Sequence, residues 1–233
     1  MLPLSDNAPV RRTPVVTIGL IVANVLVFLW ETGALERRVR LYGYYPCSVQ
    51  GPCADFVPRH HLPPWESVFS GMFMHASWLH LGGNMLFLWI FGNNVEDVLG
   101  RIRFLLWYLA GGIAATAAQT LLTLHETGDR VTAASIPNVG ASGAIAAVLG
   151  AYLMILPFAG VRTFPLFFLR LPAIFFIGLW FYGQLRLAND SFIHPQAGGG
   201  VAFFAHVGGF VFGFLTIRPL MVRDPAPPLW RGG

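Results

Sequence analysis

Long uncharged runs separated by short charged segments dominate the pattern of hydrophobic and polar positions along the chain. The first run, Thr13 to Trp30, holds 18 residues without a charge, close to the roughly 20 residues that an α-helix needs to cross a bilayer. Further apolar runs predict helices over about 79–98, 104–124, 142–157, 171–187 and 201–217. The pattern therefore predicts an all-α, polytopic membrane protein with six transmembrane helices.

Composition indicates the same class of protein. Of the 233 residues, 55% are hydrophobic and 11% are charged, and the mean hydropathy is +0.60, whereas a soluble domain carries about 25% charged residues. The net charge of +4 comes from arginines scattered around the apolar runs, a distribution that does not indicate nucleic-acid binding. The lipid bilayer is therefore a predicted partner, and nucleic acid is not.

The sequence divides into a central bundle and two short ends. We expect a short cytoplasmic tail over residues 1–12, the six-helix domain over 13–218, and a second cytoplasmic tail over 219–233. The first apolar run is longer than the core of a signal peptide, which spans about 7–15 residues. We therefore expect the first helix to be retained.

The longest polar connection, residues 31–66, holds the two cysteines of the chain. Cys47 and Cys53 could form a disulfide in an oxidising compartment, and two free thiols are the equal alternative. His60 and His61 lie nearby in the sequence but lack the spacing of a metal site. We predict no metal site here.

Arginine bias near the helix ends predicts the orientation in the membrane. With the N-terminus inside, nine of the fifteen arginines lie on the inner side and six on the outer side; the inner nine are Arg11, Arg12, Arg101, Arg103, Arg162, Arg170, Arg218, Arg223 and Arg231. We expect a multi-pass protein of the bacterial cell (inner) membrane with both termini cytoplasmic. The second, fourth and sixth helices then all begin on the outer side.

Four polar side chains occur near the starts of those three helices, namely His80, Asn84, Ser142 and His206. They are therefore expected at similar depth on one side of the membrane. A helix from Ser142 to Leu156 is about 22 Å long, shorter than the hydrocarbon core of about 30 Å, so Ser142 should lie below the outer surface. Polar groups at that depth usually face a bundle interior or a water-filled cavity.

Small residues would let the fourth and sixth helices approach closely. Gly209 and Gly213 share a face with His206, and the fourth helix has a similar stripe of Gly143, Ala147 and Gly150. The glycines could also serve packing alone. Close approach would bring the Ser142 hydroxyl to the His206 ring, and histidine is the usual base for such a nucleophile.

An oxyanion formed by attack of Ser142 would need preorganised donors. His80 and Asn84, at positions i and i+4 of one helical face, can donate together with the Ser142 backbone N–H. No acidic residue is placed to orient His206, so we expect a dyad rather than a triad. Taken singly, each residue also has a structural explanation, since polar side chains commonly link membrane helices.

Four parts of the chain carry a recognisable pattern: Phe73 to Met85, Glu96 with Gly100, Gly140 to Gly143, and Ala205 to Gly209 with Gly213. In these segments, within about residues 14–217, the chain resembles the rhomboid family of intramembrane serine proteases. The resemblance implies a six-helix core, no metal or cofactor, and cleavage of transmembrane protein substrates near the outer surface. It implies that Ser142 is the nucleophile, His206 the base, and His80 with Asn84 the lining of the oxyanion hole.

The resemblance extends to two loops. Residues 31–66 resemble the family's membrane-embedded lateral loop, and Asn189 to Gly200 resemble its flexible cap. At two positions the chain departs from the family pattern. Ala146 stands where many members carry an aromatic residue packed on the catalytic histidine, and Trp65-Glu66 stands where many carry Trp-Arg. Neither departure removes a reacting group.

We therefore hypothesise a rhomboid-type serine endopeptidase, a hydrolase that cuts peptide bonds of transmembrane segments. The main alternative is a catalytically inactive rhomboid-like protein that binds membrane clients, although such a protein would not need Ser142, His206, His80 and Asn84 together. A transporter or channel is a further alternative, but the sequence shows neither the repeat symmetry nor the broken helices typical of transporters.

Overall fold

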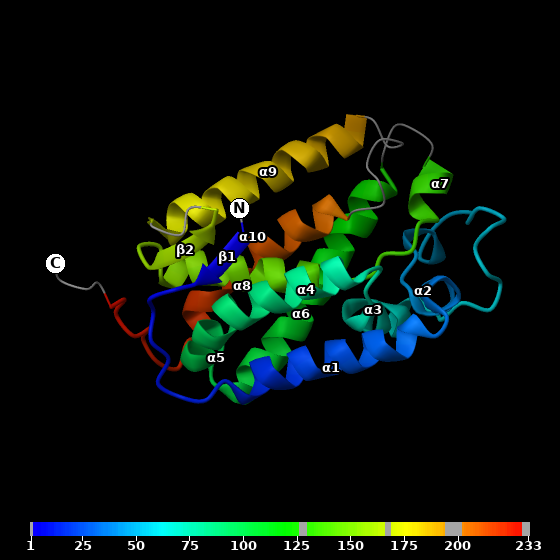
Figure 1. Ribbon diagram of the computed structural model, residues 1–233. Helices are drawn as coiled ribbons and strands as arrows, with labels where there is room; N and C mark the ends of the chain where they lie inside the picture. The colour runs from blue at the N-terminus through cyan, green and yellow to red at the C-terminus, as the bar shows by residue number, and fades with distance from the viewer. Residues whose placement is uncertain (1, 126–129, 166–168, 194–201, 230–233) are drawn as a thin grey trace.

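The computed structural model describes residues 2–125, 130–165, 169–193 and 202–229, which form a helical bundle with a small sheet at one end (Figure 1). The elements follow in the order β1 (Leu2–Ser5), α1 (Val15–Thr32), α2 (Leu35–Tyr42), η1 (Pro46–Ser48), α3 (Pro64–Phe73), α4 (Trp78–Phe87), η2 (Leu88–Gly92), α5 (Asn93–Leu99), α6 (Arg101–Thr123), α7 (Arg130–Ala134), α8 (Ser142–Ile155), β2 (Gly160–Phe164), β3 (Arg170–Pro172), α9 (Ala173–Ile193) and α10 (Phe203–Leu220).

Helices lie at all six positions that the apolar runs predict. The second of them is composed of α4, the π-helical turn η2 and α5, which follow one another without a break. Within the described residues, three helices, α1, α6 and α10, are long and apolar enough to cross a membrane. Helix α8 is apolar but has only 14 residues. The mostly helical fold class is confirmed, and the count of six spans stays a prediction.

Helix α8 lies inside the bundle, where its small side chains let α10 pack against its backbone. Every residue from Gly143 to Tyr152 is buried. A methyl group added at Gly213 would lie 1.9 Å from the carbonyl oxygen of Ala147, and one at Gly209 would lie 2.1 Å from that of Gly143. The predicted close contact between the small-residue faces of these two helices is therefore confirmed.

The two ends of the described chain meet at one end of the bundle, which we call the terminal side. Strand β1 pairs antiparallel with β2, which pairs with β3 so that Arg162 faces Arg170. The Leu229 N–H donates to the Asn7 carbonyl oxygen at 2.8 Å, and Asn7 Nδ2 donates to the Leu229 carbonyl oxygen at 3.1 Å. The segments expected as tails are thus folded against each other and, through β1, against the sheet.

Asp6 connects this sheet to the end of α8. Its Oδ2 accepts a hydrogen bond from the Tyr152 hydroxyl at 2.6 Å, and the adjacent Asn7 accepts one from the Gly160 N–H at 2.7 Å. Burial raises the pKa of Asp6 to about 6, and the hydrogen bond from Tyr152 offsets only part of that effect. The terminal side therefore contains a carboxyl group that titrates close to neutral pH.

Glu96, on α5, determines how α1 begins. Its carboxylate accepts hydrogen bonds from the backbone N–H groups of Val16 at 3.0 Å and Thr17 at 2.7 Å, and from the Thr17 hydroxyl at 2.8 Å. The first N–H groups of a helix have no acceptor within the helix, and a negative charge is favourable beside them. The buried carboxylate is stabilised in this way.

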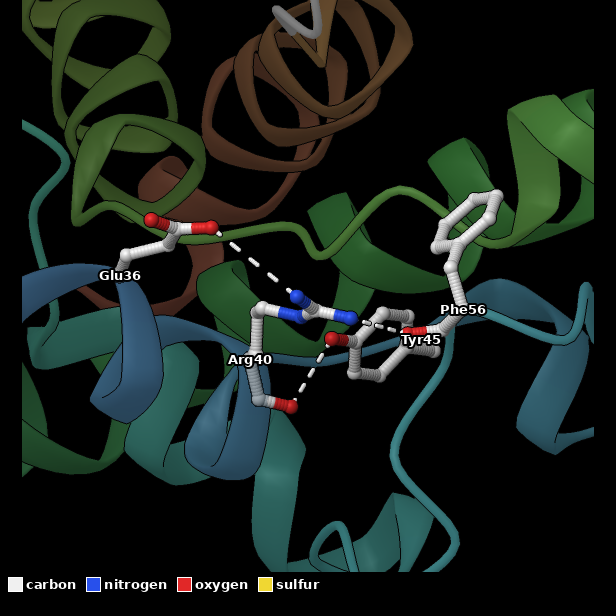
Figure 2. A network of polar contacts seen from close by, with 4 residues as sticks. All are labelled: Glu36, Arg40, Tyr45 and Phe56. Carbon is white, nitrogen blue, oxygen red and sulfur yellow. Dashed lines mark hydrogen bonds and ion pairs between the residues drawn. The ribbon is translucent and has the colours of Figure 1, made fainter.

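The connection between α1 and α4 contains α2, η1 and α3, which the sequence did not predict because such short elements have little periodicity. Figure 2 shows contacts that hold this connection together. The Arg40 guanidinium donates to the Phe56 carbonyl oxygen and lies 3.9 Å from the Glu36 carboxylate. The Tyr45 hydroxyl donates to the Arg40 carbonyl oxygen at 2.9 Å. Cys47 and Cys53 form a disulfide. The structure thus decides between the two alternatives that the sequence left open.

Helix α9 extends further than its apolar run. It continues to Ile193, so the first part of the loop predicted over Asn189 to Gly200 is helical. The three glycines at 198–200 lie outside the described residues. The polar residues Asn189 and Asp190 continue the helix beyond its apolar run, so hydropathy alone placed its end too early.

Candidate active site

Ser142 and His206 meet where α8 and α10 begin, at the end of the bundle away from the terminal side. Ser142 is the first residue of α8, and His206 lies in the first turn of α10. The close contact between the two helices brings His206 Nε2 to 2.8 Å from Ser142 Oγ. A hydroxyl bonded to an imidazole in this way can give its proton to the ring as it attacks a carbonyl carbon.

The other ring nitrogen of His206 faces a glutamine on α9. His206 Nδ1 lies 2.7 Å from Oε1 of Gln184. One turn earlier on the same helix is Trp180, whose ring centroid lies 6.1 Å from that of His206 at an angle of 40°, and Phe203 approaches the ring edge-on at 6.3 Å. Aromatic contacts with the histidine are therefore present although position 146 is a buried alanine.

His80 and Asn84 lie on the face of α4 that borders a cavity in front of Ser142. Ser77 caps this helix, because its Oγ accepts a hydrogen bond from the His80 N–H at 3.1 Å. Asn84 Nδ2 donates to His75 Nε2 at 2.9 Å, and the His75 backbone N–H donates to Glu31 Oε2 at 3.0 Å. An amide nitrogen carries two hydrogens, so Asn84 keeps one for a ligand in the cavity.

Gly140 lets the loop before α8 pass close to His80. Its φ is +130°, and a methyl group at this position would lie 2.8 Å from the His80 ring and 3.5 Å from Ser142 Oγ. The Gly140 N–H donates to the Gly71 carbonyl oxygen at 2.8 Å, which ties the loop to α3. Only glycine accommodates both the positive φ and the narrow space.

A cavity of about 540 Å³ lies in front of Ser142, with α4 on one side and α9 on the other. Its polar lining comes from Ser142, His206, Gln184, His80, Asn84 and Asn138, and its apolar lining includes Leu79, Phe87, Ile145, Leu149 and Trp180. A largely apolar cavity with a few convergent polar groups is typical of a ligand or active site.

The structure brings the four residues singled out from the sequence, Ser142, His206, His80 and Asn84, to this one cavity. Sequence reasoning missed the roles of Gln184 and His75. A signal for Gln184 was available, because it is a polar residue within an apolar run, and such residues usually face a bundle interior. His75 precedes its helix in a loop, so no helical spacing relates it to Asn84.

Comparison with known proteins identifies the family. The Rhomboid domain family profile matches residues 63–223. The human presenilin-associated rhomboid-like protein, mitochondrial, is 29% identical over 224 residues, which cover 91% of this chain and 51% of that protein. Rhomboid protein 1, mitochondrial, of Saccharomyces cerevisiae is 31% identical over 198 residues, which cover 84% of this chain and 51% of that protein. The chain belongs to the rhomboid family.

The same relatives bear on two further points. The chain spans about half the length of these curated relatives. A third relative, Rhomboid-like protein 11, chloroplastic, of Arabidopsis thaliana, is 35% identical over 86 residues, covering 37% of this chain and 28% of that protein. The human and yeast relatives, which match over most of the chain, are both named mitochondrial. The prediction of a bacterial cell membrane is therefore contradicted.

Proposed function

We propose that this chain is an intramembrane serine endopeptidase in which Ser142 is the nucleophile and His206 the base. The observation that carries the proposal is the 2.8 Å contact between Ser142 Oγ and His206 Nε2, two residues that line the cavity. Rhomboid membership supports the same reaction class.

The reaction follows from the positions of the polar groups. As Ser142 Oγ attacks the carbonyl carbon of a peptide bond, its proton passes to His206 Nε2. The negative charge on the substrate oxygen is stabilised by the Ser142 backbone N–H at the start of α8, by His80 and by the free N–H of Asn84. His206 then gives its proton to the leaving amine, and water releases the acyl group from Ser142.

The proposed substrates are transmembrane segments of other membrane proteins. Leu79, Phe87 and Leu149 line the cavity beside the polar groups, and such a lining suits the side chains of a membrane-spanning peptide better than those of a soluble one. The short α8 leaves Ser142 inside the bilayer region, where a substrate must unfold its helix to expose a peptide bond. Segments containing helix-breaking and small residues are therefore the expected targets.

Labelling with a fluorophosphonate probe tests the proposal. Purified protein in detergent should be labelled, and both Ser142→Ala and His206→Ala should abolish the labelling and the cleavage of a transmembrane reporter. Ser48→Ala, which changes a serine in the loop between α2 and α3, serves as the matched control. A folded wild-type protein that neither labels nor cleaves would instead support the inactive, client-binding alternative.

A further inference from the structure

Gln184 makes the only hydrogen bond to His206 Nδ1 found among the described residues. Its Oε1 lies 2.7 Å from that nitrogen, while Nε2 on the opposite edge of the ring lies 2.8 Å from Ser142 Oγ. The two contacts hold the imidazole at both nitrogens, one from α9 and one from α8. An aligned pair of this kind determines both where the ring points and which nitrogen carries the proton.

In a neutral imidazole, the atom that faces Nδ1 decides which of the two ring nitrogens carries the proton. One ring nitrogen carries a proton and the other a lone pair. The oxygen of Gln184 can only accept, so it places the proton on Nδ1 and leaves the lone pair of Nε2 facing Ser142. If the amide were rotated by half a turn, its nitrogen would donate to Nδ1, and Nε2 would carry the proton and could not act as a base.

We propose that Gln184 is a positioning residue of the active site, which selects the tautomer of His206 that can deprotonate Ser142. This inference rests on the proposed function. A side-chain amide performs the task of the carboxylate of a serine-protease triad, but without placing a charge in the membrane interior, where charged groups are costly. The chain thus has a third member of the site, and it is supplied by α9.

The position of Gln184 on its helix supports this role. Trp180, one turn earlier on α9, also contacts the His206 ring and lines the same cavity. Tyr182, between them in the sequence, is 58% exposed on another face of the helix. The face of α9 that carries Trp180 and Gln184 is therefore the one that holds the histidine.

Three variants separate this role from a merely structural one. Gln184→Leu removes the acceptor with little change of volume, Gln184→Glu keeps an acceptor that cannot donate when ionised, and Tyr182→Leu is the matched control on the exposed face. Rates of cleavage of a transmembrane reporter are measured as kcat and KM across pH in detergent, together with the thermal unfolding of each protein.

For Gln184→Leu we expect kcat to fall about 10- to 100-fold with KM nearly unchanged, as for a lost hydrogen bond that strengthens when the ring becomes charged. For Gln184→Glu we expect near wild-type kcat at high pH and an acid limb of kcat/KM moved up by about one pH unit, because a carboxylate favours the imidazolium. Among the described residues, His80 is the other titratable side chain that interacts electrostatically with His206. It is the same in all variants, so it does not contribute to the difference between their pH profiles.

A wild-type kcat in folded Gln184→Leu would overturn the inference, as would an unmoved acid limb in Gln184→Glu. If Gln184→Leu does not fold, the profile of Gln184→Glu decides alone. These outcomes presuppose a wild-type activity that Ser142→Ala abolishes. A wild-type protein without such activity would contradict the proposed function itself, so the two failures are distinguishable.

Discussion

Asn84 Nδ2 lies 2.9 Å from His75 Nε2, and this contact links one of the proposed oxyanion donors to a residue in the loop before α4. The His75 side chain is fully buried, and its backbone N–H is fixed by the Glu31 carboxylate from α1. The orientation of the Asn84 amide therefore depends on residues that do not line the cavity. A donor aimed in advance stabilises a developing charge without the cost of reorganisation.

Replacing His75 should consequently impair catalysis without removing a reacting group. We expect His75→Ala to lower kcat about tenfold, less than the roughly 100- to 1,000-fold expected when an oxyanion donor itself is removed in Asn84→Ala. Cleavage kinetics of both variants check this, with His61→Ala in the connection between α1 and α4 as the control. Equal activity of His75→Ala and wild type would show that Asn84 needs no support from His75.

The close contact of α8 and α10 predicts a strong effect of a single methyl group. Gly213→Ala should destabilise the fold by about 1–3 kcal/mol, because the added carbon would overlap the Ala147 carbonyl oxygen and neither backbone can easily move. The same substitution at Gly178 on α9, which has nothing within 4 Å, should be neutral or slightly stabilising. Unfolding in mixed micelles measures both variants, and similar effects at the two glycines would contradict the argument.

Stability should fall as the pH rises through the range in which Asp6 ionises. The pKa of Asp6 is raised from 3.8 to about 6 by burial, so the folded state binds this proton more tightly than the unfolded state. The protonated form therefore favours folding, and that contribution is lost between about pH 4 and pH 6. We expect a change on the order of 1–2 kcal/mol.

Unfolding of wild type and Asp6→Asn across this pH range tests the prediction. The variant cannot ionise at this position, so the part of the pH dependence due to Asp6 should disappear from its profile. Asp55→Asn, in the exposed part of the loop between α2 and α3, is the control substitution of the same type. An Asp6→Asn profile parallel to that of wild type would rule out Asp6 as the source.

The disulfide should stabilise its loop without affecting catalysis. Cys47 and Cys53 are six residues apart, and closing so short a loop contributes about 2 kcal/mol in the chain-entropy account. Cys47→Ser with Cys53→Ser should therefore make residues 44–57 more sensitive to protease while leaving the labelling of Ser142 unchanged. Loss of labelling in a folded double variant would mean that this loop shapes the active site.

Much of the fold was predictable because hydropathy and helical spacing are local properties. The helix around Thr13 to Trp30 and the stripes of Gly209 and Gly213 could be located from the printed sequence, and the expected contact between α8 and α10 follows from them. The strand that holds Asp6 and the short helices between α1 and α4 could not be located in this way. Such elements are determined by hydrogen bonds to distant segments, for example from Gly160 to Asn7.

The sequence by itself determined the class of protein and four candidate residues, since apolar runs must cross the bilayer and His80, Asn84, Ser142 and His206 occur near helix starts that the alternating topology puts on one side. Only the tertiary structure decided which groups surround His206. Gln184 is 22 residues away from it, and no periodicity relates one face of α9 to one face of α10. A side-chain contact between two helices depends on their relative rotation, which packing of the whole bundle decides.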